Sequence, residues 1–283
     1  MSVAAWLIPE AARVSPPLYI LTVSAAVLLT GFSKGGFGGG LGILATPLFM
    51  QVLPARLALA MMLPVLIVCD LFTLRHFPRE WDPTSFWRIA GGMVAGLIVG
   101  TVLLVLLGSI GPTGDRILKL AVGGLSLAFC LLKFSEPLWK KRSSPTEQET
   151  NDASPSRPGW AIGTFLGVLG GMATMLAHAA GQIVGVHFLS HRLPPARFVG
   201  TTARFYLTFN TLKIPFFLLA GALSREPYLT LDTLRWNLWM FPLGGAGVAA
   251  GAWLNRRMNA TLFTWVVYAL LFVTGLRMVV SAW

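Results

Sequence analysis

The feature that most constrains this chain is a series of apolar runs long enough to cross a bilayer. They lie at residues 56–74, 88–108, 116–133, 198–222, 235–254 and 261–281. About 20 apolar residues in a helix span a hydrocarbon core of about 30 Å. Only 12% of the residues are charged, against roughly a quarter in soluble domains. Because backbone groups must be hydrogen-bonded internally within a bilayer, the runs predict an all-α polytopic membrane protein.

A glycine-rich stretch interrupts the apolar pattern near the N-terminus. It reads Gly31-Phe-Ser-Lys-Gly-Gly-Phe-Gly-Gly-Gly-Leu-Gly-Ile-Leu-Ala-Thr-Pro47, and its lysine has no acidic neighbour in the sequence. It joins two arms, residues 18–32 and 38–50, that are each short for a bilayer. Unwound backbone in a membrane must be buried in protein or line a cavity, and the free N–H groups of broken helices suit anions. We therefore predict a re-entrant hairpin with an anion site; the alternative is that the glycines only allow close helix packing.

The same plan occurs twice along the chain. Residues 160–176 and 181–190 again form two short arms, and three longer runs follow them. Leu53-Pro-Ala-Arg56 corresponds to Pro194-Pro-Ala-Arg197, and the pair Gly96 and Gly100 corresponds to Gly247 and Gly251. Duplication is the natural source of such a pattern. The predicted organisation is a segment at residues 1–17 without a signal-peptide pattern, a first repeat at 18–133, a flexible linker at 134–159 and a second repeat at 160–283.

The distribution of basic residues predicts the topology. They gather in the linker, around residues 75–88, around residues 191–197 and at residues 256–257. Placing all four groups, and hence the linker, in the cytoplasm obeys the positive-inside rule. Each repeat is then one re-entrant hairpin plus three membrane helices, so the two repeats are inverted relative to each other, as in many secondary transporters. If instead each pair of short arms is one kinked crossing helix or two tilted spans, the topology changes.

One predicted helix, residues 198–222, carries a polar face. Thr202, Tyr206, Asn210 and Lys213 fall on one side of an α-helix. A lysine and an asparagine deep in an apolar run are costly unless they face a cavity or a partner. We interpret this face as part of a binding site; the alternative is that Lys213 extends to the membrane interface.

These features together give a set of candidate site residues. The predicted substrate-binding groups are Lys34, Gly36, Gly38, Gly39, Gly40, Gly181, Gln182, Thr202, Asn210 and Lys213. Two further residues are candidates for proton coupling, namely Asp70 and His178. Asp70 has two possible ion-pair partners, Lys34 within the membrane or Arg75 at the interface.

Several function classes have no support in the sequence. The net charge is +11, but the basic residues are scattered between apolar runs, without the basic helix or aromatic motif of a nucleic-acid-binding protein. There is no hydrolase, metalloprotease or P-loop signature, so we expect no enzyme activity, no cofactor and no bound metal. Cys69 and Cys130 lie in separate apolar runs and are predicted to be core residues. The paired glycines at residues 96, 100, 247 and 251 serve either internal packing or a homodimer.

The chain resembles the sulfite exporter TauE/SafE family over nearly its whole length. The resemblance is strongest in residues 35–47 and in Gly200-Thr201, Asn210 and Lys213-Ile-Pro215. It implies a bacterial inner-membrane permease that exports sulfite, organosulfonates or similar small anions. The second hairpin departs from the family in being poorer in glycine, with the sequence Ala177-His178-Ala-Ala-Gly181-Gln182, so the identity of the anion stays open. The rival functions are a passive anion channel and a membrane-embedded enzyme.

Overall fold

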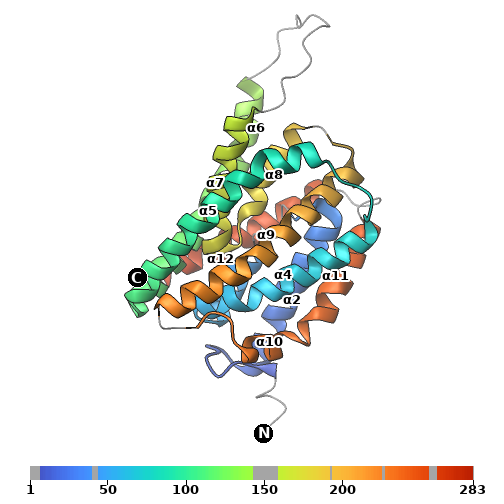
Figure 1. The fold of residues 1–283 in the computed structure, drawn as a ribbon. Helices are drawn as coiled ribbons and strands as arrows, with labels where there is room; N and C mark the ends of the chain where they lie inside the picture. The colour runs from blue at the N-terminus through green and yellow to red at the C-terminus, as the bar shows by residue number, and fades with distance from the viewer. Residues whose placement is uncertain are drawn as a thin grey trace, which may run out of the picture.

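The fold is a bundle of helices, seen in a computed structural model that describes residues 7–39, 44–142, 159–191, 193–224, 227–254 and 260–282 (Figure 1). Every regular element within those ranges is a helix. The helices are α2 Pro16–Phe37, α3 Ala45–Val52, α4 Ala55–His76, α5 Pro83–Ser109, α6 Pro112–Arg142, α7 Trp160–Ala177, α8 Ala180–Ser190, α9 Pro195–Ser224, α10 Leu231–Asn237, α11 Met240–Leu254 and α12 Ala260–Val280.

By length and composition, five helices in the described ranges qualify to cross a membrane. These are Pro16–Phe37, Ala55–His76, Pro83–Ser109, Trp160–Ala177 and Ala196–Ser224. Both cysteines are buried thiols, as the sequence predicts. The observed helices confirm the prediction of an all-helical, multi-pass membrane protein.

The first predicted hairpin differs in detail from expectation. We expected its first arm to end at residue 32, but α2 continues through Lys34 to Phe37 and, with 22 residues, is about 33 Å long. The prediction of a short first arm is therefore wrong. Gly38 and Gly39 then take φ values of 63° and 80° and end the helix, in a left-handed region that glycine adopts without strain. The second arm, α3, has only 8 residues, and residues 40–43, including the candidate Gly40, lie outside the described ranges.

Two other predicted boundaries also move. The run at residues 235–254 is not one span, because it divides into α10 and α11. Pro242 falls in the first turn of α11, where its missing N–H is tolerated, whereas inside one continuous helix it would remove a hydrogen bond. Helix α6 continues to Arg142, past the boundary that the sequence placed at residue 133. The rest of the predicted linker, residues 143–158, lies outside the described ranges.

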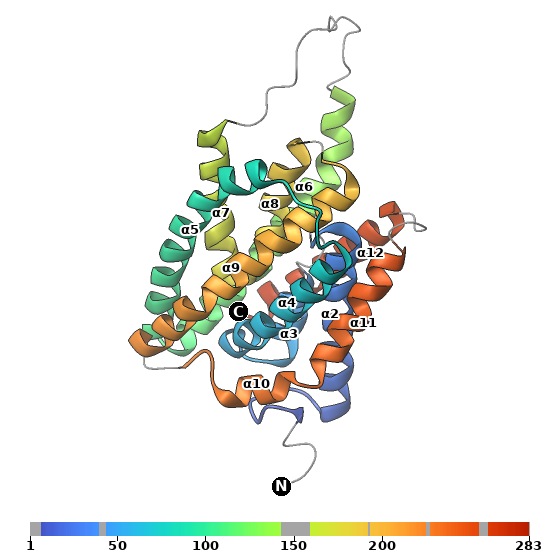
Figure 2. The ribbon, with the colours of Figure 1, turned by 45° about the vertical axis from the view of Figure 1, so that its right-hand side comes forward.

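The two halves of the bundle make reciprocal contacts. Helix α2 of the first half packs mainly against α11 of the second, and α7 of the second half packs mainly against α5 of the first. The corresponding helices α4 and α9 contact each other, as do α6 and α12. Figure 2 shows α5 beside α7 and α2 beside α11. This arrangement agrees with a duplicated plan, while the inverted relation of the repeats stays a prediction.

Glycines make these close helix contacts possible. A Cβ added to Gly96 of α5 would collide with the carbonyl oxygen of Val168 in α7, and one added to Gly251 of α11 would collide with the carbonyl of Phe32 in α2. The other members of the paired motifs, Gly100 and Gly247, also face neighbouring helices. These glycines therefore pack helices within one chain, which decides between the two roles considered for them. A homodimer stays a prediction that they do not support.

Two adjacent glycines of α5 test this packing. A Cβ on Gly92 would overlap the backbone of Thr164, whereas a Cβ on Gly91 would have no atom within 4 Å. We expect Gly92→Ala to lower the free energy of unfolding by about 1–3 kcal/mol through overpacking. Gly91→Ala is the matched control and should be neutral or stabilising by up to about 1 kcal/mol, since alanine favours helix. Thermal unfolding in detergent compares them, and equal melting temperatures would contradict the assigned contact.

Two connections that are far apart in the sequence meet at one end of the bundle. Arg197 at the start of α9 donates to the carbonyl of Trp81 at 3.1 Å, and the Arg204 guanidinium lies 5.3 Å from the Trp81 ring centroid. The Thr201 hydroxyl accepts a hydrogen bond of 2.8 Å from the backbone N–H of Asp82. The connections α4–α5 and α8–α9 therefore lie together, and α10 lies at the opposite end (Figures 1 and 2). Which end faces the cytoplasm stays a prediction.

Candidate functional site

Charged and polar side chains gather inside the bundle, between α2, α4, α9 and the junction of α7 with α8. Asp70 and Lys213 have no exposed surface, and Lys34 and Asn210 are each 5% exposed. The polar face predicted for residues 198–222 is therefore buried in the protein. Because Lys213 is completely buried, the alternative in which it extends to the interface is wrong.

Lys34, Asp70 and Asn210 form one cluster. The Lys34 ammonium is paired with one oxygen of the Asp70 carboxylate, and the Asn210 amide donates to the other oxygen at 2.8 Å. The Lys34 nitrogen also lies 5.0 Å from the centroid of the Tyr206 ring, which is within cation–π range. Of the two partners considered for Asp70, Lys34 is confirmed and Arg75 is wrong, because Asp70 lies in the interior.

Lys213 forms a second cluster with neutral partners. Its ammonium donates to the Thr174 hydroxyl at 3.0 Å and to Nδ1 of His178 at 2.7 Å. The other ring nitrogen of His178, Nε2, is 2.9 Å from the carbonyl oxygen of Leu59. A carbonyl can only accept, so Nε2 carries the hydrogen and Nδ1 offers a lone pair to Lys213. His178 is therefore a neutral imidazole in this arrangement.

The backbone of His178 sets the position of its ring. His178 caps α7 with φ at 52° and ψ at 28°, and it is the one non-glycine residue with positive φ in the described ranges. Non-glycine residues adopt this conformation rarely. The turn separates α7 from α8 and places the imidazole between Leu59 and Lys213. Backbone strain of this kind is typical of functional sites.

The charges of the two clusters do not cancel. Lys34 and Asp70 neutralise each other, whereas no carboxylate in the described ranges lies within ion-pair distance of Lys213. The site therefore carries one net positive charge when Lys213 is protonated. A buried charge without a counter-ion is unfavourable, and an anion would relieve it. No group of three or more His, Cys, Asp or Glu side chains in the described ranges has the arrangement of a metal site.

A small cavity adjoins both clusters. Its volume is about 30 Å³, and its lining residues are Lys34, Gly39, Leu66, Thr174, His178, Ala180, Gly181, Tyr206 and Asn210. A space of this size holds only one or two water molecules. A sulfur oxyanion or an organosulfonate is larger than this space.

Five predicted substrate-binding residues are not among those that line this cavity, namely Gly36, Gly38, Gln182, Thr202 and Lys213. A Cβ on Gly38 would lie 2.7 Å from the hydroxyl oxygen of Thr202, and that hydroxyl donates to the Val199 carbonyl at 2.9 Å. Gly36 is helical and faces Gly251 of α11. Gln182 is half-buried in the first turn of α8. None of these positions tests a role in binding, so the binding roles of these candidates stay predictions.

The sequence analysis did not assign two of the residues at the site. Thr174 binds Lys213, and Tyr206 covers Lys34. Thr174 precedes His178 by one helical turn, a spacing that could have identified it as a neighbour. Tyr206 was recognised on the polar face of its helix but was not given a role.

Comparison with known proteins agrees with the architecture of a membrane protein. The family described as "Sulfite exporter TauE/SafE" matches residues 23–278, a range that includes both halves and every candidate site residue. No curated protein and no solved structure matches the chain significantly. The match spans nearly the whole chain, and its helices are those of a membrane protein. The chain therefore belongs to the sulfite exporter TauE/SafE family.

Proposed function

We propose that the protein is a secondary transporter that exports a small sulfur-containing anion, such as sulfite or an organosulfonate, across the bacterial inner membrane. Membership of a sulfite exporter family supports the substrate class. The observation that carries the proposal is Lys213, a fully buried lysine whose hydrogen-bond partners are both neutral. An anion is the ligand that would complete its electrostatics.

In this proposal the anion binds where the end of α2, the junction of α7 and α8, and the middle of α9 meet. Lys213 supplies the charge, and the amide of Asn210 supplies a directional hydrogen bond. Gly181 is in the first turn of α8, where backbone N–H groups have no partner within the helix. Such N–H groups favour negative charge. Gly38 and Gly39 let the chain approach α9 closely, which would shape the side of the site next to Lys34.

Transport requires the closed cavity to open toward each side in turn. The reciprocal packing of α2 with α11 and of α7 with α5 gives two tightly packed helix pairs. We propose that these pairs move against each other around α4 and α9, as inverted repeats do in other transporters. The tight glycine contacts favour motion of each pair as a rigid unit.

Asp70 and His178 are the proposed proton-coupling groups. Proton uptake by Asp70 would break its ion pair and leave Lys34 as a second positive charge beside the cavity. Proton uptake by His178 at Nδ1 would remove the lone pair that Lys213 uses. Either event changes the charge available to an anion, so binding of substrate and of a proton would be linked.

Flux into proteoliposomes distinguishes this function from its rivals. We expect uptake of radiolabelled sulfite to saturate, to accelerate with unlabelled sulfite on the opposite side, and to respond to an imposed pH gradient. A passive channel would give unsaturated flux without acceleration. A membrane-embedded enzyme would return the anion chemically changed. Saturable flux of unchanged sulfite or sulfonate supports a transporter, and its absence for every sulfur anion overturns the proposal.

Thermal unfolding against a panel of anions identifies the substrate. A ligand at 100 times its dissociation constant, binding only folded protein, stabilises by about 2.7 kcal/mol. We expect one of sulfite, thiosulfate, sulfoacetate or taurine to raise the melting temperature, and chloride to leave it unchanged. An equal response to all these solutes would indicate general salt stabilisation and would contradict a specific site.

A further inference from the structure

A tyrosine hydroxyl at the central site has no hydrogen-bond partner. Tyr206 lies on α9, one helical turn before Asn210, and only 8% of its surface is exposed. Its hydroxyl oxygen is buried and makes no hydrogen bond in the described part of the chain. A buried tyrosine normally finds a partner for this group, because an unpaired hydroxyl has lost the hydrogen bonds that it makes with water. An unpaired polar group in the interior therefore requires a physical reason.

Contacts on several sides hold the ring of Tyr206. The ammonium nitrogen of Lys34 lies 5.0 Å from the ring centroid, and the Phe205 ring packs edge-on with 6.0 Å between the two centroids. A Cβ added to Gly39 would lie 3.0 Å from Cε2 of Tyr206, so a larger residue at position 39 would press on the ring. These contacts keep the hydroxyl oxygen in one position at the site.

Tyr206 also belongs to the lining of the cavity of about 30 Å³. The other polar side chains that line this cavity are Lys34, Thr174, His178 and Asn210. Each of these four is hydrogen-bonded or ion-paired to another side chain. Among the polar side chains known to line the cavity, Tyr206 is therefore the one that lacks such a partner.

We propose that the hydroxyl of Tyr206 donates a hydrogen bond to an oxygen atom of the transported anion. This inference rests on the proposed function and adds a binding residue to the site. A tyrosine hydroxyl carries one donor, and the oxygens of a sulfonate or sulfite accept; hydrogen bonds to charged acceptors are the strong ones. Because a sulfur oxyanion is larger than the cavity, its entry must widen the space that Tyr206 lines. Its oxygens then come within reach of the hydroxyl.

The variant Tyr206→Phe removes the hydroxyl and keeps the ring beside Lys34, since phenylalanine also makes cation–π contacts. The probe is whichever of sulfite, thiosulfate, sulfoacetate and taurine stabilises the unmodified protein most, and thermal unfolding in detergent gives its dissociation constant. We expect Tyr206→Phe to raise this constant by about tenfold or more, the effect of losing one hydrogen bond to a charged group. Without anion, its melting temperature should equal or exceed that of the unmodified protein, because the variant lacks an unpaired buried hydroxyl.

Tyr19→Phe is the matched control. Tyr19 is fully buried, and its hydroxyl lies 4.0 Å from the sulfur of Met61. It is on the same helix as Lys34, about 22 Å from it along the helix axis. The dissociation constant of the probe in Tyr19→Phe should therefore equal that in the unmodified protein.

The outcomes separate this inference from the proposed function. If none of the four compounds stabilises the unmodified protein, the proposed anion site fails, and the role of Tyr206 fails with it. If the probe binds the unmodified protein and Tyr206→Phe equally well, the anion site stands and only the role of Tyr206 is overturned. A lower melting temperature of Tyr206→Phe with an unchanged dissociation constant would assign the hydroxyl a structural partner, such as an ordered water molecule, and would also overturn it. Equal weakening in Tyr19→Phe and Tyr206→Phe would have the same consequence.

Discussion

Lys213→Met is expected to reduce sulfite or sulfonate flux by about 100-fold, since a desolvated charge pair is worth several kcal/mol. Methionine matches the length and flexibility of lysine but carries no charge. The ammonium of Lys213 is fully buried and donates only to Thr174 and His178. Removing it relieves the unfavourable burial of a charge, so the folded state should survive. Loss of flux without loss of fold is the signature of a residue that acts on the anion.

The measurement is flux into proteoliposomes together with the melting temperature of each variant. Thr211→Val is the matched control, because Thr211 lies on the same helix with its side chain exposed. Its flux should equal that of the unmodified protein. The melting temperature of Lys213→Met should stay within about 5 °C, which corresponds to roughly 1–2 kcal/mol for a chain of this size. Undiminished flux in Lys213→Met would remove this residue from the anion site.

The polar face of α9 illustrates what the sequence makes predictable. Asn210 and Lys213 stand in an apolar run, where helical periodicity alone brings them to one side. The cost of exposing them to lipid then requires that this side face protein or a cavity. Their burial in the structure follows from these two facts. By the same reasoning, the pairing of Asp70 with Lys34 could be predicted as one of two alternatives.

The end of the first helix shows where this reasoning stops. Glycines in a row favour an unwound segment, yet Gly31, Gly35 and Gly36 stay helical because α11 packs directly against them. Only Gly38 and Gly39, which have positive φ, leave the helix. A glycine that allows close packing and a glycine that ends a helix are identical in the sequence. The partner helix decides between them, and it lies more than 200 positions away.

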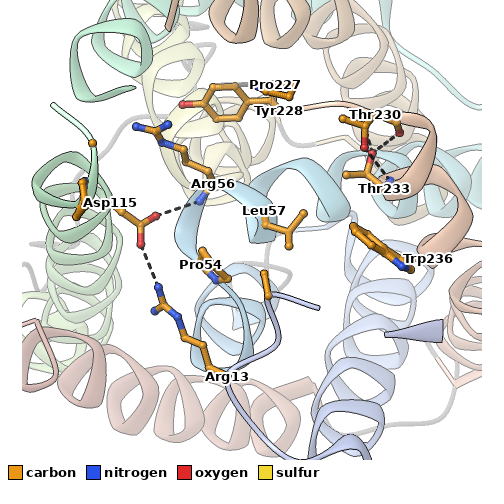
Figure 3. A pocket seen from close by; sticks show the side chains of 13 residues that line it. Arg13, Pro54, Arg56, Leu57, Asp115, Pro227, Tyr228, Thr230, Thr233 and Trp236 are labelled. Atoms are coloured by element: carbon orange, nitrogen blue, oxygen red, sulfur yellow. Dashed lines mark hydrogen bonds and ion pairs between the residues drawn. The ribbon is translucent and has the colours of Figure 1, made fainter. Parts of the chain in front are cut away.

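A pocket of about 510 Å³ at the end of the bundle near α10 depends on contacts that have no local pattern (Figure 3). Arg13 precedes the first repeat, Arg56 and Asp115 lie on two different helices of that repeat, and Trp236 belongs to the second repeat. Each residue alone is an ordinary polar or aromatic residue near the end of an apolar run. Their convergence depends on the path of residues 7–15 and on the division between α10 and α11. That division is also the boundary that sequence analysis placed wrongly.

Breaking the ion pair between Lys34 and Asp70 is expected to cause a large loss of stability. Asp70→Asn leaves Lys34 as a buried charge without its counter-ion, and Lys34→Met leaves Asp70 with the Asn210 amide alone. Removing one member of a buried pair costs about 3–5 kcal/mol, so each variant should melt about 10 °C lower. In the double variant neither charge of the pair remains. The double variant should therefore be more stable than either single variant.

Thermal unfolding of all four proteins in one detergent closes this double-mutant cycle. A strong coupling energy is expected, because the two charges are in direct contact in the interior, where they are almost completely buried. If the losses in the two single variants simply add in the double variant, the ion pair does not stabilise the fold. Flux measured on the same four proteins separates an effect on function from an effect on stability. A double variant that folds but shows no response to a pH gradient would place proton coupling at Asp70, whereas a retained response would move the coupling to His178, the other buried group at the cavity that can accept a proton.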